Sequence, residues 1–331
     1  MRAKIAILSL ILLATGVVPA SAEPVLIRGA WVIPTTWLSA LWMAKKDLAV
    51  HDGKSYVFEP EHFRGTPPMI TALANDQLQI GELAFSTLPI AIENAGMNDL
   101  RVIAGSFQQI PGYGVTPFMV LKDGPIHSIG DLKGKVVATN AQGAAVDIAM
   151  KAMLRRHGLH ANRNYTEIEA PFAAMTAMLA EHKADLVPEA PPFLFAPKVK
   201  EIARTLFTVP QAFGPTQFVV FVAREPFIQA HRAALVDFLE DTIRIAHWYM
   251  NPKNHAAVEQ IMAKLTHQPA SHFSWIFTKR DFYHSPDLLP NLAYLQKNVD
   301  LVYKLGFVKA KLNVKAHSDL SLVEEAAARL K

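Results

Sequence analysis

The sequence predicts an α/β protein built from two lobes with a cleft between them. Beyond residue 22, short apolar runs alternate with segments of helical spacing, a rhythm typical of α/β domains with a largely parallel sheet. Two of these runs, Val115–Lys122 and Thr216–Arg224, are similar, because each ends in a basic residue before a turn that contains proline. They enclose a unit of roughly a hundred residues, a normal domain size. We therefore expect this unit to form one lobe and the flanking segments to form the other.

The lobe boundaries are expected at these two runs. Lobe 1 should combine residues 23–117 and 216–331, and lobe 2 should comprise residues 118–215. Ligands of open α/β sheets bind outside the carboxyl ends of the strands, and both lobes would present such ends to the cleft. The functional site is therefore expected in the cleft.

Hydrophobic periodicity predicts the individual elements. Before the first crossover we expect strands at 25–32, 55–63, 78–85 and 100–107, and helices at 37–50, 67–74 and 88–95. Within the inserted unit we expect strands at 135–139, 165–170 and 184–188 and a helix at 172–182. The clearest helix begins at Val146 and presents apolar residues on one face as far as Leu154, with Gly158 suited to its C-cap. From Pro226 onward the pattern is mostly helical.

The first 22 residues have the features of a secretory signal peptide. Arg2 and Lys4 precede an apolar run from Ile5 to Val18, and Ala20-Ser21-Ala22 is a small-x-small cleavage site. The run is too short to span a membrane. We expect cleavage after Ala22 and export, which in a bacterium means the periplasm. A lipid anchor on a cysteine at the cleavage site is excluded, because the chain contains no cysteine.

Composition excludes several classes of function. The absence of cysteine excludes thiol nucleophiles, cysteine–zinc sites and iron–sulfur clusters. Removal of Arg2 and Lys4 lowers the formal charge from +4 to +2, and no run of basic residues suggests a nucleic-acid partner. The thirteen histidines form no convincing metal set; His157 and His160, for example, are separated by the helix-ending Gly158. We expect no metal, no cofactor and no catalytic motif.

Two segments resemble a known family. "KDGPIHSIGDLKGKVVATNAQGAA" (Lys122–Ala145) is similar to the entry into the second lobe of solute-binding proteins of ABC importers, in the class that serves nitrate, sulfonate, taurine and thiamine-precursor uptake. "FRGTPPMITALANDQLQIGELAFSTLPIAIENAG" (Phe63–Gly96) is similar to a first-lobe segment of that class. The chain departs from the family pattern at Gly81-Glu82 and Asn75-Asp76, which we expect in turns outside the pocket. The resemblance implies the two-lobed, type II periplasmic binding protein fold.

Two small polar turns are candidates for binding an anion. Ser86 and Thr87 follow a strand and precede a helix, and Gln142, Gly143 and Ala144 repeat this arrangement in the other lobe. Helix N-termini offer free N–H groups and a partial positive charge. Two of them at one cleft would clamp an anion without a buried lysine. The alternatives are simple N-capping by Ser86 and Thr87 and a tight turn at Gly143.

Five further residues are candidates for ligand contact. Thr35, Thr36 and Trp37 follow the first strand, where the ligand loop of the family lies, although Trp37 could equally belong to the core. Arg64 could pair with an anionic group or be a surface arginine. Glu189 ends a strand at the cleft and could accept an ammonium or hydroxyl group of a ligand. Lobe 2 also carries phenylalanines, which indicate an organic body on the ligand: Phe172, Phe193 and Phe195.

The resemblance implies an extracytoplasmic solute-binding protein that captures a small anionic organic solute, of the sulfonate or carboxylate type, and delivers it to an ABC permease in the inner membrane. We expect a monomer that makes no bond and binds no nucleic acid. Two alternatives remain at this point. One is an enzyme like the thiamine-pyrimidine synthases on the same fold, which carry a cysteine-rich motif that this chain lacks. The other is a module that presents its ligand to a membrane sensor. The identity of the solute is not determined by the sequence.

Overall fold

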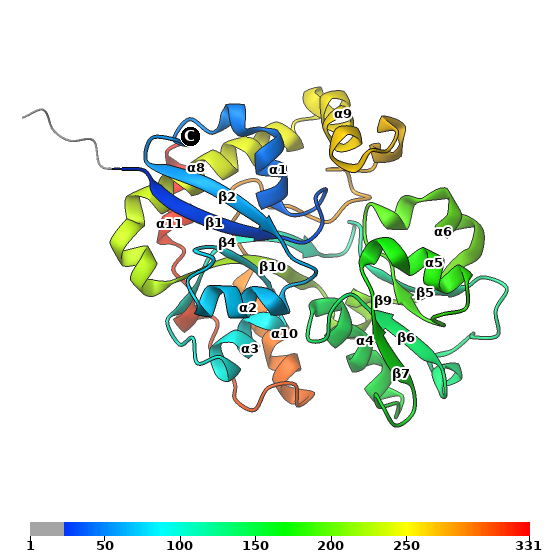
Figure 1. Ribbon diagram of the computed structural model, residues 1–331. Coiled ribbons are helices and arrows are strands. Elements are labelled where there is room, and N and C mark those ends of the chain that lie inside the picture. Colours follow the sequence, from blue (N-terminus) through cyan, green and yellow to red (C-terminus); the bar gives the residue numbers. More distant parts are fainter. Residues whose placement is uncertain (1–22) are drawn as a thin grey trace, which may run out of the picture.

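The computed structural model describes residues 23–331 and arranges them in two α/β lobes (Figure 1). The expected signal peptide, residues 1–22, lies outside the described residues. Within residues 23–331, none of the helices combines the length and the apolar character that a membrane crossing requires.

Lobe 1 is built on strands that come from both ends of the chain. Its strands are β1 (Val25–Trp31), β2 (Tyr56–His62), β3 (Gly81–Ala84), β4 (Leu100–Gln109) and β10 (Thr216–Arg224). β1 and β2 are parallel, whereas β10 lies antiparallel between β3 and β4. The carbonyl oxygen of Arg28 accepts the N–H groups of Gln79 and Ile80, which joins β1 to the segment that enters β3. The helices around these strands are α1 (Leu38–Ala44), α2 (Pro67–Ala74), α3 (Thr87–Asn94), α8 (Glu225–Met250), α9 (His255–Thr266), α10 (Leu292–Lys304) and α11 (Ser321–Ala328).

Lobe 2 has a second set of strands and its own helices. The strands are β5 (Pro117–Leu121), β6 (Val136–Thr139), β7 (Thr166–Glu169), β8 (Val187–Pro188) and β9 (Ala203–Thr208). β6 and β7 are parallel, β5 is antiparallel to both β8 and β9, and a bridge between Val137 and Leu186 links the two groups. The helices are α4 (Ala145–Arg156), α5 (Met175–Ala180), α6 (Pro197–Ile202) and α7 (Val209–Phe213). All of these strands fall within or at the edge of the expected lobe 2, whose exact boundaries stay a prediction.

The expected alternation of strands and helices is confirmed, but the sheets are not purely parallel, because β10 in lobe 1 and β5 in lobe 2 each run antiparallel to their two neighbours. An apolar run such as Thr216–Arg224 predicts a buried strand without indicating its direction. The direction is set by the return of the chain from lobe 2, which brings β10 back antiparallel to β3 and β4. Strand β9 was not predicted from the sequence, because its exposed and half-buried residues Arg204, Thr205 and Leu206 weaken the apolar pattern.

The largest hydrophobic cluster continues across the junction of the lobes. It includes Trp37 and Phe218 from lobe 1 together with Val146 and Phe172 from lobe 2. The lobes are therefore closed upon each other, and the side chains that line the cleft are packed against the opposite wall.

Candidate functional site

A narrow cavity lies between the lobes at the carboxyl ends of their strands. Lobe 1 contributes Trp37, Thr66 and Phe218, and lobe 2 contributes Asn140, Val146 and Phe172. The cavity holds about 30 Å³, which is space for about one or two water molecules. The position of the cavity agrees with the expectation for open α/β sheets. The small volume of the cavity means that the lobes are closed in this conformation.

Three contacts hold the two walls together. The Ser86 hydroxyl donates to the carbonyl oxygen of Gly143 at 2.9 Å. The Asn140 side-chain amide donates to the carbonyl oxygen of Arg64 at 3.2 Å. At Gly65 a Cβ atom would lie 2.9 Å from both the Cβ of Ala141 and the Nδ2 of Asn140, so only glycine permits this approach. The two turns that the sequence analysis singled out, at 86–87 and at 142–144, are thus brought together.

The turn before α4 is organised by carboxylates. The N–H of Gln142 donates to Glu169 at 2.6 Å, and the N–H of Gly143 donates to Asp147 at 2.6 Å. Gly143 has a φ of 82°, a left-handed conformation that favours glycine. In this conformation the two N–H groups expected to bind an anion are therefore already paired. Ala144, the N-cap residue, is buried against the cavity.

Asp147 is held in turn by a buried ion network. Lys151 lies 2.9 Å from Asp147 and 3.0 Å from Glu167, so one cation serves two carboxylates. Burial raises the pKa of Asp147, and Lys151 opposes that effect. The sequence around Gly143 did not predict that this ion network would hold the turn before α4. The four-residue spacing from Asp147 to Lys151, however, is that of a helical ion pair.

The hydroxyls of the opposite turn are used within the protein. Thr87 accepts the N–H of Ala84 at 2.9 Å and donates to the carbonyl of the same residue at 3.1 Å. Ser86 makes no capping hydrogen bond to α3, and its hydroxyl reaches lobe 2 instead. Simple capping of α3 therefore does not describe Ser86.

Two residues that line the cavity, Trp37 and Thr66, and the two threonines that precede Trp37 in the chain carry buried polar atoms without partners in the described part of the chain. The hydroxyls of Thr35, Thr36 and Thr66 and the indole N–H of Trp37 have no hydrogen-bond partner among the described residues. An unpaired buried polar group costs about 1–3 kcal/mol, so a ligand or water that pairs with these atoms is favoured. Trp37 also packs edge-on against Phe107, with ring centroids 5.0 Å apart, and so belongs to both the core and the wall of the cavity. The side chain of Arg64, by contrast, is exposed.

Glu189 is buried beside the crossover into lobe 2. Its N–H donates to the carbonyl of Pro117, and one carboxylate oxygen accepts the hydroxyl of Thr176 at 2.7 Å. The other oxygen, Oε2, has no partner among residues 23–331. Burial raises the pKa of the Glu189 carboxyl to about 7. This group is therefore poised to change its charge near neutral pH.

Glu82 does not lie in a turn, contrary to the prediction from the sequence. It stands in β3, completely buried, and accepts the N–H of Ser39 at 3.0 Å and the hydroxyl of Ser106 at 2.7 Å. Burial raises the pKa of its carboxyl to about 7. Because the accepted N–H lies in the first turn of α1, Glu82 anchors the start of the helix that follows Thr35–Trp37.

One cluster of possible metal ligands exists among the described residues. His51, Asp237 and Glu240 each offer a ligand atom within 4.8 Å of the others. Both carboxylates are already paired with arginine: Arg329 lies 2.8 Å from Asp237, and Arg244 lies 2.5 Å from Glu240. A divalent cation would have to displace two guanidinium groups, so the cluster is better described as an ion-pair network.

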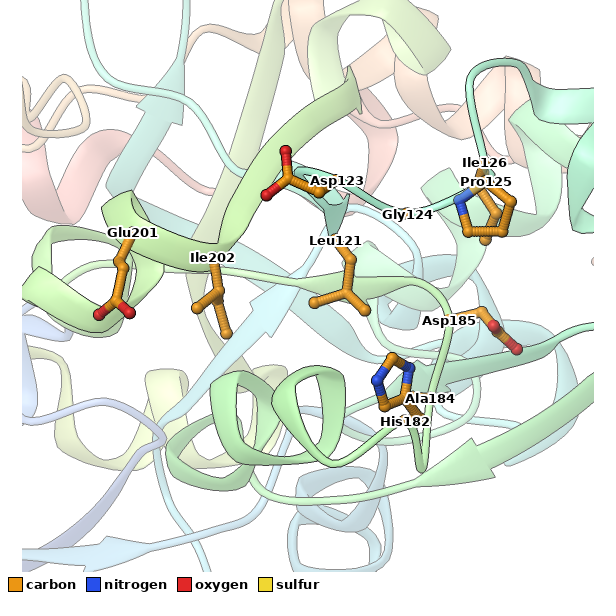
Figure 2. A pocket seen from close by; sticks show the side chains of 10 residues that line it. All are labelled: Leu121, Asp123, Gly124, Pro125, Ile126, His182, Ala184, Asp185, Glu201 and Ile202. Atoms are coloured by element: carbon orange, nitrogen blue, oxygen red, sulfur yellow. The ribbon is translucent and has the colours of Figure 1, made fainter.

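A larger hollow of about 570 Å³ lies on lobe 2, away from the cleft (Figure 2). It is found where β5 ends, whereas the crossover and the cleft lie where β5 begins. Figure 2 shows the carboxylates of Asp123, Asp185 and Glu201 spread around its rim rather than converging on one point. Asp185 already accepts the N–H of Val136 at 2.9 Å. The hollow therefore lacks the inward-facing polar groups that mark the cleft.

Comparison with known proteins identifies the family. The model of the NMT1/THI5-like family matches residues 90–255, half of the chain. This chain belongs to the NMT1/THI5-like family. The expectation drawn from the two quoted segments is confirmed, and the matched range contains Asn140, Asp147 and Glu189. No curated protein matches the chain by sequence.

Solved structures with the same fold include binding proteins and an enzyme. The alkanesulfonate-binding protein SsuA from Xanthomonas axonopodis pv. citri, bound to MOPS, matches with a TM-score of 0.70 and 17% identity, over 91% of this chain and 100% of that chain. The periplasmic nitrate-binding protein NrtA from Synechocystis PCC 6803 matches with a TM-score of 0.71 and 12% identity, over 93% of this chain and 90% of that chain. The desulfurization enzyme DSZB matches with a TM-score of 0.66 and 10% identity, over 93% of this chain and 100% of that chain. These likenesses establish the two-lobed periplasmic binding protein fold for this member of the family.

Proposed function

We propose that this protein is the extracytoplasmic solute-binding component of an ABC importer. It captures a small anionic organic solute, of the sulfonate or carboxylate type, between its lobes and delivers it to a membrane permease. The observation that carries the proposal is that the indole N–H of Trp37 and the hydroxyl of Thr66, which line the cavity between the lobes, are buried without a partner among residues 23–331. The hydroxyls of Thr35 and Thr36, next to Trp37 in the chain, are buried and unpaired within the same residues. The family and the fold of the named binding proteins support it.

The proposed binding mode places the anionic end of the solute at α4. The first N–H groups of an α-helix lack partners within the helix, and Ala145 and Val146 line the cavity. Asn140 adds an amide at the same end. The aromatic rings of Trp37, Phe172 and Phe218 would cover an organic body. Because the cavity has space for little more than water in this conformation, a solute can enter only when the lobes open, and the side chains that line the cavity must move aside to hold the solute when the lobes close again.

Binding without chemistry is preferred over the enzyme alternative. DSZB demonstrates that an enzyme has this fold. The chain offers no cysteine, however, so nucleophilic attack by a thiol and a cysteine-rich motif are both excluded. The buried carboxylates of Asp147 and Glu189 in lobe 2 are explained by support of the α4 turn and by contact with Thr176. Presentation of the solute to a membrane sensor would use the same site.

A thermal-shift screen tests the proposal. The mature chain is incubated with nitrate, aliphatic and aromatic sulfonates including MOPS, carboxylates and pyrimidines. A true solute at a hundredfold excess over Kd should stabilise the protein by about 2.7 kcal/mol. The same mixtures are then analysed for new products by mass spectrometry. Stabilisation without turnover supports a binding protein, whereas no stabilisation by any compound, or turnover of one, contradicts the proposal.

Glu189 should make solute binding depend on pH. A protonated carboxyl tolerates a nearby anion, so binding should weaken by about tenfold between pH 6 and pH 8 as a group with a pKa of about 7 loses its proton. Glu189→Gln should remove this dependence and bind at pH 8 as the wild type binds at pH 6. Calorimetric titration with the best compound of the screen measures both. The control is Glu181→Gln, which changes an exposed glutamate of the same lobe. If Glu189→Gln keeps the pH dependence of binding, Glu189 does not act on the bound solute.

Export is a further part of the proposal. The Ala20-Ser21-Ala22 pattern predicts cleavage after Ala22 in a bacterial host, releasing a chain that begins at Glu23. Intact-mass measurement on the periplasmic fraction checks this. Recovery of protein that retains residues 1–22 would argue against a cleaved signal peptide.

A further inference from the structure

Two aromatic contacts join the lobes outside the cleft. Phe195 of lobe 2 stacks on Trp275 of lobe 1, with ring centroids 4.7 Å apart and an angle of 27° between the rings. The guanidinium of Arg280 lies over the same ring of Phe195, 4.9 Å from its centroid. Phe195 is thus held between an indole and a cation of the opposite lobe. We refer to Phe195, Trp275 and Arg280 as the outer clasp.

The outer clasp reaches into the core of lobe 1. Trp275 is 1% exposed and belongs to a hydrophobic cluster formed by lobe 1 residues such as Trp42 and Phe238. Among the described residues, Phe195 alone of lobe 2 packs against that cluster. Figure 1 shows the segment that follows α9 on the side of lobe 1 that faces α5 and α6 of lobe 2.

A second contact lies at the end of α4. Arg155 donates to the carbonyl of Leu305 at 2.6 Å, and its guanidinium lies over the ring of Phe307, 4.0 Å from the centroid. Leu305 and Phe307 follow α10 in lobe 1. We refer to Arg155, Leu305 and Phe307 as the inner clasp. Neither clasp includes a residue that lines the cavity between the lobes.

We propose that the two clasps set the balance between open and closed lobes, and through it the affinity for the solute. A cleft that binds its ligand on closure has an apparent affinity proportional to the fraction of closed protein. Contacts that exist only in the closed form raise that fraction without touching the solute. Phe195 and Arg155 are therefore positioning residues, whose substitution opens the protein while leaving the binding groups unchanged. This inference rests on the lobe closure that the proposed function requires.

The test measures closure directly and uses no solute. The chain contains no cysteine, so Lys54→Cys in lobe 1 and Lys133→Cys in lobe 2, both at exposed positions, carry a unique pair of spin labels. Pulsed electron paramagnetic resonance gives the distribution of distances between them. Phe195→Ala should raise the ratio of open to closed protein by about tenfold, the size expected for a lost aromatic pair. Arg155→Ala should act in the same direction, and the double variant should multiply the two effects because the clasps share no residue.

Three variants separate closure from general damage. Phe195→Tyr retains the ring and should behave as the wild type. Arg280→Gln alters an exposed side chain and should open the lobes to a smaller extent. Phe227→Ala removes another half-buried phenylalanine, one that contacts His231 within lobe 1, and should leave the distances unchanged.

Equal distance distributions for wild type, Phe195→Ala and the double variant would overturn the proposal. An equal effect of Phe227→Ala would also overturn it, because loss of packing rather than loss of the clasp would then explain the opening. Because no solute is present, these outcomes are independent of whether the thermal-shift screen finds a ligand.

Discussion

Replacement of Gly65 by leucine is expected to reduce solute affinity at least hundredfold while both lobes stay folded. A Cβ atom at this position would lie 2.9 Å from Ala141 and Asn140, across the junction of the lobes. No side chain fits there while the lobes are closed, so the variant should be held open and the closed, binding-competent fraction should fall. Calorimetry with the solute found in the screen measures the affinity. Small-angle scattering should give a larger radius of gyration than for the wild type.

Substitution of Gly65 tests the need for lobe closure more specifically than substitution of Gly143 does. Gly143 has a φ of 82°, so any side chain there strains the backbone as well as the junction. No such positive φ occurs at Gly65, and its crowding comes from the opposite lobe. Gly130→Leu is the matched control, because a Cβ atom there would meet only the Ser128 hydroxyl, at 3.7 Å. Wild-type affinity in Gly65→Leu would mean that binding does not require the closed junction.

Replacement of Glu82 by glutamine is expected to stabilise the protein at alkaline pH. Burial raises the pKa of this carboxyl from 4.5 to about 7. The folded state therefore holds a proton that the unfolded chain releases, and the stability contributed by this proton is lost as pH rises from about 4.5 through 7. A tenfold change in proton affinity is worth about 1.4 kcal/mol, so wild type should lose about 2–3 kcal/mol from this group between pH 5 and pH 8.

Glutamine can keep both contacts of Glu82 without carrying a charge. Its oxygen can accept the N–H of Ser39, and its amide can donate to the hydroxyl of Ser106. Denaturant unfolding at pH 5 and pH 8 should therefore show a smaller loss of stability for Glu82→Gln than for wild type. The exposed Glu59→Gln on β2 is the control. If the free energy of unfolding changes with pH in the same way for Glu82→Gln and for wild type, the folded protein stabilises the ionised carboxylate of Glu82, and the prediction is wrong.

Local patterns in the sequence were sufficient for most of the strands and helices, and they led to a prediction of where the site lies. Alternating apolar runs located strands such as β1 and β4, and the spacing from Val146 to Leu154 located α4. These signals are local because the periodicity of a strand or helix is set by its own backbone. The same reasoning placed the candidate residues of both lobes in loops at the carboxyl ends of strands. The sequence also excluded cysteine chemistry outright.

The tertiary structure decided everything that depends on partners distant in the chain. The return of β10 from lobe 2 determined the mixed direction of the lobe 1 strands. The N–H groups of Gln142 and Gly143, which the sequence predicted as donors to an anion, donate instead to the carboxylates of Glu169 and Asp147, respectively. Glu82 was hidden for the same reason, since its partner Ser39 lies 43 residues away. Sequence periodicity reports which face of an element is buried, whereas the identity of the group that meets that face is set by how the elements pack.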